Sequence, residues 1–479
     1  MKRIYLFVEE HHFTLLVIFL FILSVLYSTL SILRHNHFQS GGFDLGLYDQ
    51  AAWQFAHFLN PYNTVKERLI FGDHLVLTLP VFGLLFYLWD NVRILLIAQA
   101  VIITFSALPI YWIAQKRLSS AVSATGLAIL YSLFYGIQYG VYFDFHPIII
   151  GVAILSWLAY FWEFSKTRLF WITLVIALLT QENMGIAVIG LAVIFFFRRE
   201  FRNRAVVVAI IGIAYSLLAA RITAQFSPVG YQYWPQLPKN LDDAVTRLFD
   251  SEEKRLVWLI SYSTLSFFPL FSIGSLIAVL MDLSQYFVTG PEFSRMWSPF
   301  MHHRAMLAPL LVLGSVDVLA FIKKRVRVAY VVFGMVAVGL SLQYYYHFPL
   351  NKLSKAEYWK EEAWMQDNRK LISQVPLGAS VATQQNLVPH LSHRKEIYLL
   401  WPRQHDIAEK PCGQSLCWWL DFGGKPEYLV VDTRPNQWLT QTLESNENWL
   451  SAIGNMEKTG RIVLVGSAGD AKLYRVVWK

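Results

Sequence analysis

Long apolar segments recur along most of this chain and limit what it can fold into. They lie at residues 13–33, 75–89, 92–114, 121–141, 148–164, 169–180, 184–197, 205–224, 256–281, 305–322 and 328–346. An apolar helix of about 20 residues crosses the hydrocarbon core of a bilayer. Because 55% of the residues are hydrophobic and only 15% are charged, we expect a multi-pass helical membrane protein.

The beginning of the chain favours an anchored span over a secretory signal peptide. The apolar run at residues 13–33 is too long for a signal-peptide core, and no small-residue cleavage motif follows it. We therefore expect this segment to stay in the membrane, with the preceding Lys2 and Arg3 in the cytoplasm.

Short basic clusters predict the orientation of the other segments. They are Lys116/Arg117, Lys166/Arg168, Arg198/Arg199/Arg202/Arg204 and Lys323/Lys324/Arg325/Arg327. If all of them are cytoplasmic, segment 75–89 does not cross fully, and segment 256–281, which contains Pro269, is bent or paired. The formal net charge of +8 comes with no polybasic arm, so nucleic acid is not an expected partner.

This topology places the polar loops on one side, outside the cytoplasm. The loops are 41–74, 143–147, 181–183, 227–255 and 282–304. We expect residues 1–348 to form a membrane domain of about 9–12 spans or half-spans in the inner or plasma membrane, with a cytoplasmic N-terminus. Residues 349–479 are expected to form an extracytoplasmic soluble α/β domain.

The tail has the pattern of a small soluble domain. Strand-like runs occur at residues 379–383, 396–400, 428–432, 461–466 and 472–478, with one helical stretch at 358–374. The motif HLSHR at residues 390–394 is interpreted as a solvated turn, or as a site for an acceptor or lipid headgroup. We hypothesise a disulfide between Cys412 and Cys417, because oxidation is permitted outside the cytoplasm.

Carboxylates gather in the loops on the outer side. Asp44 and Asp49 lie in the first loop, where residues 44–59 have the spacing of an amphipathic helix. Glu182 interrupts an apolar hairpin, which is a costly place for an ionisable group. Ionisable groups near lipid are usually functional, so Asp44, Asp144 and Glu182 are the candidate catalytic acids. The alternatives are an N-cap role for Asp44 and solvent-facing or paired charges for the others.

One pair of residues has the spacing of a chelate. Asp144 and His146 are separated by one residue ahead of Pro147, which is typical of a helix start. Such a pair binds a divalent ion or positions a phosphate, although a cap followed by a buried histidine has the same pattern. A divalent metal, Mg²⁺ or Mn²⁺, therefore stays open as a cofactor.

Cationic side chains near the outer loops are candidates for binding a phosphate. They are Arg304, His303, Arg221 and His74, and the secondary site candidates are Asp49, Asp73, His302, Tyr231 and Trp234. A guanidinium binds phosphate through two parallel hydrogen bonds. Tyr and Trp rings stack on sugars or lie at the membrane interface.

This set of residues fits transfer of a group from a phosphate-bearing lipid. A carboxylate deprotonates or orients the acceptor hydroxyl, and a cation neutralises the leaving phosphate. The sequence has no nucleotide-binding loop or nucleophile elbow in a meaningful position, which excludes nucleotide and serine-hydrolase chemistry. The hypothesis requires that acids, imidazoles and a guanidinium from distant loops converge in one outward-opening cavity beside lipid.

Several motifs resemble a known family. They are FDLGLYDQAAW and FGDH in the first loop, FDFHP, the QEN hairpin, HHRAMLAP and the tail motif NLVPHLSHRKEIYLLWP. They are similar to a prokaryotic membrane-protein family catalogued as a domain of unknown function and placed in the GT-C glycosyltransferase clan. The resemblance covers nearly the whole chain. It implies a GT-C-like bundle with juxtamembrane helices in the first outer loop and a polyprenyl-phosphate sugar as donor.

The resemblance also implies roles for particular acids. Asp44 matches the position of the first-loop catalytic acid of the clan, and Asp144 lies where a second acidic site often occurs. The family pattern implies a basic residue before Glu182, whereas this chain has Gln181. A DxD pair, common in metal-dependent members, is absent from the sequence, which leaves metal dependence open.

The leading hypothesis is a cell-envelope glycosyltransferase that moves a sugar from a polyprenyl-phosphate-linked donor to a glycan, lipid or protein acceptor on the outer face. The alternatives are a lipid or solute transporter or flippase with an outward polar cavity, and a non-catalytic assembly or sensor protein. Transporters place ionisable groups near the midplane and often contain paired repeats. Here the acids cluster at one surface and the sequence has no evident repeat, which favours the enzyme.

Overall fold

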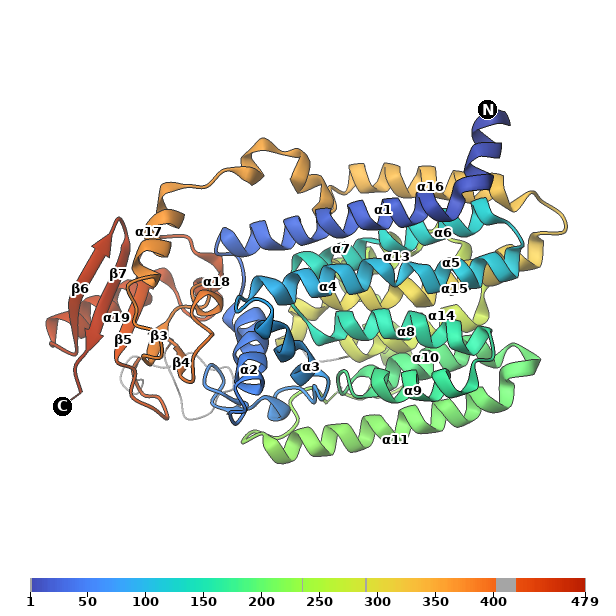
Figure 1. Cartoon of the computed structure of the whole chain (residues 1–479). Coiled ribbons are helices and arrows are strands. Elements are labelled where there is room, and N and C mark those ends of the chain that lie inside the picture. Colours follow the sequence, from blue (N-terminus) through green and yellow to red (C-terminus); the bar gives the residue numbers. More distant parts are fainter. Residues whose placement is uncertain (1, 235, 289–290, 402–418, 479) are drawn as a thin grey trace.

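A computed structural model describes residues 2–234, 236–288, 291–401 and 419–478 (Figure 1). Its larger part is a bundle of helices that run side by side. Five helical stretches in the described chain are long and apolar enough to cross a membrane: Glu9–Asn36, Arg93–Leu118, Arg199–Phe226, Ser294–Ile322 and Val328–Tyr345. A sixth span is formed if α6 (Ala121–Ser132) and α7 (Tyr135–Tyr142), which meet at a 41° bend, are counted as one. The protein is therefore a multi-pass membrane protein.

Shorter apolar helices complete the bundle. They are α8 (Pro147–Glu163), α9 (Thr167–Leu178), α10 (Met184–Phe196) and α14 (Ile273–Phe287). The expected break in segment 256–281 is confirmed, because α13 (Glu252–Ser263) and α14 are separated by a short 3₁₀ turn that contains Pro269. Pro269 has no backbone N–H to donate, so the helix cannot continue through it.

Segment 75–89 does not form a long helix. It contains only α3 (Leu79–Gly83) and a 3₁₀ turn, η3 (Leu84–Tyr87), and these pack on α2 (Leu47–Ala56) from the first loop. α3 and η3 are too short to cross about 30 Å of hydrocarbon. The first loop and this segment together provide the expected juxtamembrane helices.

The basic clusters meet at the end of the bundle opposite the C-terminal domain (Figure 1). Glu163, which is buried, forms ion pairs with Lys116 at 3.4 Å and with Arg198. Lys323 donates to the backbone carbonyl of Arg117 at 2.6 Å. Residues from separate clusters therefore lie at one end, as the predicted topology requires.

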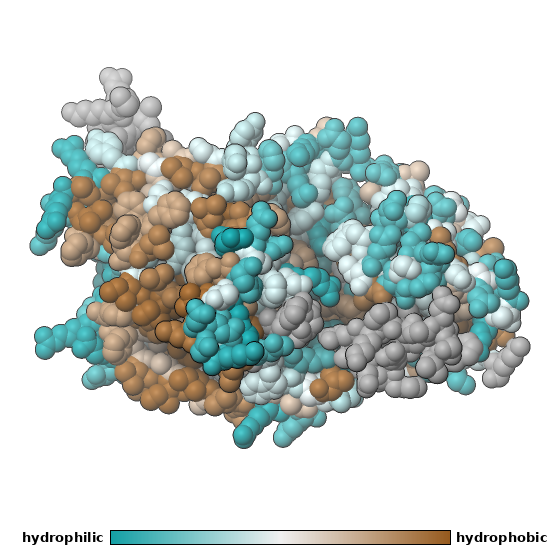
Figure 2. All heavy atoms as spheres, turned by 180° about the vertical axis from the view of Figure 1, so that it is seen from behind, coloured by the Kyte–Doolittle hydropathy of each residue, from teal (hydrophilic) through white to brown (hydrophobic). Residues whose placement is uncertain are grey.

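The outer surface of the bundle is apolar. Phe21 on α1 (Lys2–Asn36), Ile210 on α11 (Arg202–Phe226) and Phe333 on α16 (Val328–Tyr345) are 62%, 60% and 74% exposed. Figure 2 shows hydrophobic residues gathered over the bundle, whereas hydrophilic residues cover the C-terminal domain. Such a large exposed apolar surface is the surface that lipid would cover.

The tail after α16 forms a small domain around a five-stranded sheet of order β4-β3-β5-β7-β6. The strands are β3 (Val381–Thr383), β4 (Ile397–Leu399), β5 (Tyr428–Asp432), β6 (Ile462–Ala468) and β7 (Ala471–Val476). β3 pairs in parallel with β4 and β5, and β7 pairs antiparallel with β5 and β6.

All five predicted strands are thus present. The helices are α17 (Ala363–Ile372), inside the predicted stretch 358–374, and α18 (Trp438–Gln441) and α19 (Asn446–Lys458), which the sequence analysis did not predict. The hypothesised disulfide between Cys412 and Cys417 lies outside the described residues.

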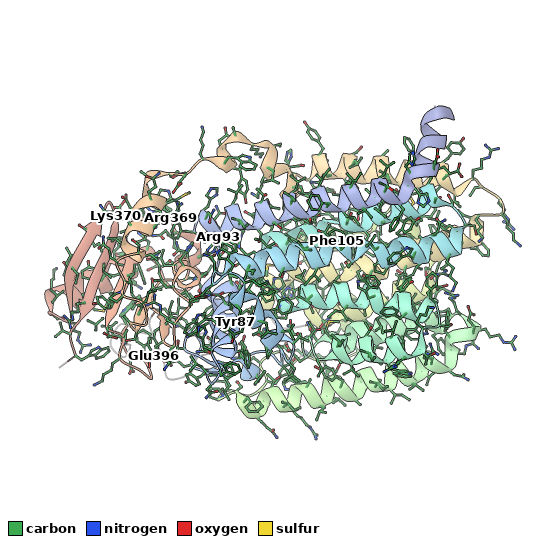
Figure 3. All side chains as sticks on the ribbon, in the orientation of Figure 1. Tyr87, Arg93, Phe105, Arg369, Lys370 and Glu396 are labelled. Atoms are coloured by element: carbon green, nitrogen blue, oxygen red, sulfur yellow. The ribbon has the colours of Figure 1, made fainter. Side chains whose placement is uncertain are left out.

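Arg369 joins the C-terminal domain to the bundle at the end of α1, where Arg93 binds the same residue from within the bundle. Arg93, the first residue of α4 (Arg93–Phe105), donates to the side-chain oxygen of Asn36 at 2.6 Å, and Arg369 of α17 reaches the Asn36 carbonyl at 3.5 Å. Figure 3 shows both side chains at this junction. The ring of His35 stacks on that of His390 at 4.1 Å.

The HLSHR motif is therefore not a solvated turn, and that prediction is wrong. Ser392 and Arg394 are buried, and His390 lies on the end of the first span. Ser392 also donates to Asp49 of the first loop. The motif is polar because it binds polar groups of the bundle, which a sequence pattern does not distinguish from solvation.

Candidate active site

The first loop begins with an irregular turn that carries Asp44. Residues Gly42–Gly46 form a π-helical turn, η1, which continues into α2. The predicted N-cap role of Asp44 is wrong, because the capping position is Gly41 and no side chain accepts a capping hydrogen bond there. π-Helical turns are rare and frequently occur at functional sites.

The carboxylate of Asp44 faces a histidine from the FDFHP motif. His146 Nε2 lies 3.1 Å from Asp44 Oδ1, and because a carboxylate oxygen accepts, this nitrogen donates. The Asp44 side chain is 30% exposed, whereas that of His146 is 5% exposed. The His146 ring stacks on His302 at 3.7 Å. Asp44 is thus an accessible acid held by a buried, packed imidazole.

Asp144 holds the backbone of the same loop. Its carboxylate pairs with Arg34 at the end of α1 and accepts the Gly41 N–H at 3.0 Å. Burial raises the pKa of Asp144 to about 6, and Arg34 opposes that rise. The residue has φ of 118°, a strained conformation for a side chain with a Cβ.

This geometry corrects two expectations for Asp144. Asp144 is 2% exposed and both of its oxygens are engaged, so it positions the Asp44 loop and does not face an open cleft as a catalytic acid. Asp144 and His146 also do not form a chelating pair, because one side chain binds Arg34 and the other binds Asp44.

A buried glutamine fixes the FDFHP loop. Gln99, on α4, donates to the Asp144 carbonyl at 2.7 Å and accepts from the His146 N–H at 2.7 Å. These two hydrogen bonds from one side-chain amide define the path of the loop between α7 and α8. Gln99 was not among the residues predicted to form the site, although a glutamine inside an apolar segment is itself a signal of an internal partner.

Glu182 is buried in the QEN turn between α9 and α10 and binds the end of the first loop. Its Oε1 lies 2.7 Å from His74 Nδ1, and its Oε2 accepts the Leu75 N–H at 3.1 Å. Burial lowers the pKa of His74, but Glu182 and Asp73 outweigh that effect, and the net pKa is raised. Glu182 itself is only 4% exposed. The alternative that it is a solvent-exposed turn residue is wrong.

Lys66 adds a cation that the sequence analysis did not single out. Its Nζ lies 2.6 Å from Asp73 Oδ1 and 5.3 Å from the centre of the Phe43 ring, next to Asp44. Burial raises the pKa of Asp73, but Lys66 and His74 reverse the effect, so the net pKa is lowered. Lys66 and His74 are each 17% exposed, so both remain accessible.

Aromatic rings link the two acid clusters. The Tyr48 ring lies 6.3 Å from that of His74 and 5.8 Å from that of His146. Tyr233 stacks on His74 at 5.2 Å, and Tyr231 lies edge-on to Tyr233 at 5.8 Å. Trp234, the other predicted aromatic, packs against Tyr231 at 5.3 Å and is 55% exposed. The structure therefore brings Asp44 and Glu182 to one region, separated by a tyrosine ring.

The predicted phosphate-binding residues on the last outer loop and on α11 have other surroundings. Arg304 is fully buried, and its guanidinium donates to the backbone carbonyls of Met296 and Ser298. His303 lies against Tyr286, with ring centres 4.7 Å apart, and against His302 at 3.9 Å, so it forms the far end of the ring stack that begins at His146. Arg221 is exposed on α11. Arg304 is thus engaged by its own loop, whereas His303 is packed into the ring stack beside Asp44.

Possible metal ligands among the described residues are histidine and acidic side chains. Within residues 2–234, 236–288, 291–401 and 419–478, no group of three or more His, Cys, Asp or Glu side chains is arranged to hold a metal ion. Asp44 presents a carboxylate that is 30% exposed, and Lys66 and His74 are each 17% exposed. Such a combination can activate a hydroxyl and bind an anion.

A family model described as "Predicted membrane protein (DUF2079)" matches residues 34–452, which include the whole site. The chain belongs to this family. No curated protein matches the chain.

Two solved structures are similar to this fold over nearly the whole chain. Both are ArnT, a GT-C glycosyltransferase, from Cupriavidus metallidurans. The form bound to undecaprenyl phosphate has 12% identity and a TM-score of 0.55, and the match covers 96% of this chain and 98% of ArnT. The apo form has 13% identity and a TM-score of 0.53, with 97% and 98% covered. This DUF2079 member therefore has an ArnT-like GT-C fold.

Proposed function

We propose that this DUF2079 protein is a membrane glycosyltransferase that moves a sugar from a polyprenyl-phosphate-linked donor to an acceptor hydroxyl. The observation that carries the proposal is the partly exposed carboxylate of Asp44, held by His146 at the end of a GT-C bundle. The undecaprenyl phosphate bound to the ArnT neighbour supports a polyprenyl-phosphate lipid as the donor carrier.

In the proposed reaction, residues of the site act together in a displacement at the anomeric carbon. Asp44 takes the proton of the acceptor hydroxyl while the oxygen of that hydroxyl attacks the anomeric carbon. The bond from the carbon to the phosphate oxygen breaks, and its electron pair leaves with the polyprenyl phosphate. His146 Nε2–H fixes the orientation of the carboxylate, and stacking on His302 fixes the imidazole. A positioned base of this kind typically contributes about 10²–10⁴-fold to the rate.

Lys66 and His74 replace Arg304 and Arg221 as the proposed phosphate-binding residues. Both are accessible, and the raised pKa of His74 favours its cationic form. A leaving phosphate gains negative charge as the bond breaks, so cations placed there stabilise the transition state. We place the site outside the cytoplasm and the N-terminus inside, because the basic clusters occupy the opposite end of the bundle. The acceptor is a glycan, lipid or protein of the cell envelope.

The test uses the full-length protein in detergent with undecaprenyl-phosphate-linked hexoses and pentoses and a membrane extract as the source of acceptor. Release of undecaprenyl phosphate is measured by mass spectrometry. Asp44→Asn should lower turnover by about 10²-fold or more, with unchanged folding, whereas Asp242→Asn on an exposed helix should not. Wild-type turnover by Asp44→Asn, or no release from any donor, would reject the proposal.

A further inference from the structure

A cavity of about 490 Å³ lies between the first loop and the C-terminal domain, apart from Asp44. The first loop contributes side chains from Gln54 to Glu67, and the C-terminal domain contributes Lys395, Glu396, Tyr398 and two glycines. Figure 3 places Glu396 at the edge of the sheet domain beside α2. The volume is within the range of sites that bind small ligands.

Hydrogen bonds hold the two walls of the cavity in a fixed relation. Thr64 Oγ1 accepts the Ile397 N–H at 2.8 Å and donates to the Ile397 carbonyl at 2.6 Å. Glu67 accepts the Gly423 N–H at 2.9 Å. Gln54 donates to the backbone carbonyls of Tyr62 and Lys395. The cavity is therefore built jointly by both domains, and its shape depends on their docking.

The lining can bind hydroxyl groups from several sides. Its polar side chains are the amides of Gln54 and Asn60, the carboxylates of Glu67 and Glu396, the Lys395 ammonium and the Tyr62 phenol. The hydroxyls of Thr64 and Tyr398 also line the cavity, but Thr64 is bonded to Ile397 and Tyr398 donates to Glu396. Gln54 is 3% exposed, and within the described chain its Oε1 has no hydrogen-bond partner. Tyr62 is 41% exposed, and an aromatic ring of this kind can pack against the C–H face of a sugar.

The charge of the lining selects among sugars. Two carboxylates and one ammonium give a formal charge of −1, which disfavours phosphate or carboxylate groups on a ligand. The carboxylates and the Gln54 amide oxygen accept hydrogen bonds from hydroxyls, while the Asn60 amide and the Lys395 ammonium donate to them. A neutral saccharide or an amino sugar matches this pattern, and an anionic sugar does not.

We propose that this cavity binds a neutral or amino saccharide unit of the acceptor, remote from the reacting hydroxyl. Gln54 follows Asp44 by ten residues along η1 and α2, a helical rise of about 15 Å. The occupant is thus a part of the acceptor that does not react but contributes binding energy to the transfer. The inference rests on the proposed glycosyltransferase function and names the chemical class of its acceptor.

Saturation-transfer NMR on the full-length protein in detergent tests the inference. The probes are maltose, glucosamine and glucose 6-phosphate. Maltose or glucosamine should receive saturation, and glucose 6-phosphate should receive several-fold less. Glu396→Gln and Tyr62→Ala should each lower the signal of the bound sugar several-fold. Glu447→Gln, which removes the same charge from an exposed turn of α19, is the matched control and should not change it.

The outcome can be separated from that of the proposed function. Asp44→Asn should bind the saccharide as the wild type does, because the cavity does not include Asp44. Equal saturation of glucose 6-phosphate, or a signal that Glu396→Gln and Tyr62→Ala leave unchanged, would overturn the inference even if Asp44→Asn abolishes transfer. Saccharide binding by an Asp44→Asn variant that retains full turnover would reject the assignment of Asp44 and leave the sugar site standing.

Discussion

Asp49 of the first loop and His393 of the C-terminal domain form a partly buried hydrogen bond, with His393 Nε2 3.0 Å from Asp49 Oδ1. Asp49 is fully buried, and Ser392 donates to its second oxygen. The other ring nitrogen of His393 lies 2.8 Å from the exposed carboxylate of Asp90. One histidine therefore binds two acids from two parts of the membrane domain and couples the C-terminal domain to the loop that carries Asp44.

The first prediction concerns pH. Burial lowers the pKa of His393, but the carboxylates of Asp49 and Asp90 outweigh it, so the net pKa is raised. A raised folded-state pKa stabilises the docked form fully below the unfolded value of about 6.5, and this contribution is lost as pH rises through the folded-state pKa. The difference in Tm between wild type and His393→Gln should be larger at pH 6 than at pH 9. An equal difference at both pH values would contradict the ionic role.

The second prediction concerns close packing of the first loop against the C-terminal domain. A Cβ on Gly42 would lie 2.7 Å from Gln385 Oε1, and a Cβ on Gly46 would lie 2.6 Å from Val388 Cγ1. Gly46→Ala should therefore lower the free energy of unfolding by about 1–3 kcal/mol through overpacking. It should also make the contact between the first loop and the C-terminal domain more sensitive to limited proteolysis. Gly454→Ala on α19 is the control, because open space surrounds that position. Unchanged proteolysis of Gly46→Ala would contradict the prediction and show that the contact between the first loop and the C-terminal domain accommodates the added methyl group.

The third prediction concerns the buried pair of Arg34 and Asp144. Asp144→Asn retains an acceptor for the Gly41 N–H but leaves the Arg34 guanidinium buried without its counter-ion. We expect a loss of about 3–5 kcal/mol in unfolding free energy, measured by denaturation in detergent. The double variant Arg34→Gln/Asp144→Asn should recover part of that loss. An equal loss in the double variant would mean that the charge pair itself is not responsible.

The fourth prediction separates positioning from chemistry at the acid. His146→Gln retains a donor toward Asp44, whereas His146→Ala removes it and leaves a gap beside His302. His146→Ala should lower kcat by about 10²-fold, because a displaced catalytic group loses alignment. His146→Gln should retain more activity, with KM little changed in both variants. If His146→Gln and His146→Ala lowered kcat equally, the result would indicate proton transfer through His146 itself.

The fifth prediction concerns Arg304, which the sequence analysis assigned to donor phosphate. Its guanidinium binds the backbone carbonyls of the loop before it and is fully buried. Arg304→Lys should therefore lower thermal stability, because one ammonium cannot reproduce the two-pronged geometry. Affinity for undecaprenyl phosphate should stay close to that of the wild type, whereas Lys66→Ala should weaken it. A selective loss of lipid affinity in Arg304→Lys would restore the original assignment.

The sequence alone determined the class of the protein and much of its chain path. Apolar length predicted the spans, basic clusters predicted which ends lie together, and Pro269 predicted the break between α13 and α14. All five strands of the tail were predicted from alternating short runs. These features depend on local composition and periodicity, which are properties of neighbouring residues.

Only the tertiary structure decided what each polar group binds. Asp44 and Asp144 both come from motifs that the sequence marks as acidic, yet one is accessible and the other is paired inside with Arg34. Lys66 and Gln99 gained roles through contacts with elements distant in sequence. The free-energy cost of burying a charge depends on its partner. The packing of helices and loops determines that partner, and a local sequence pattern does not.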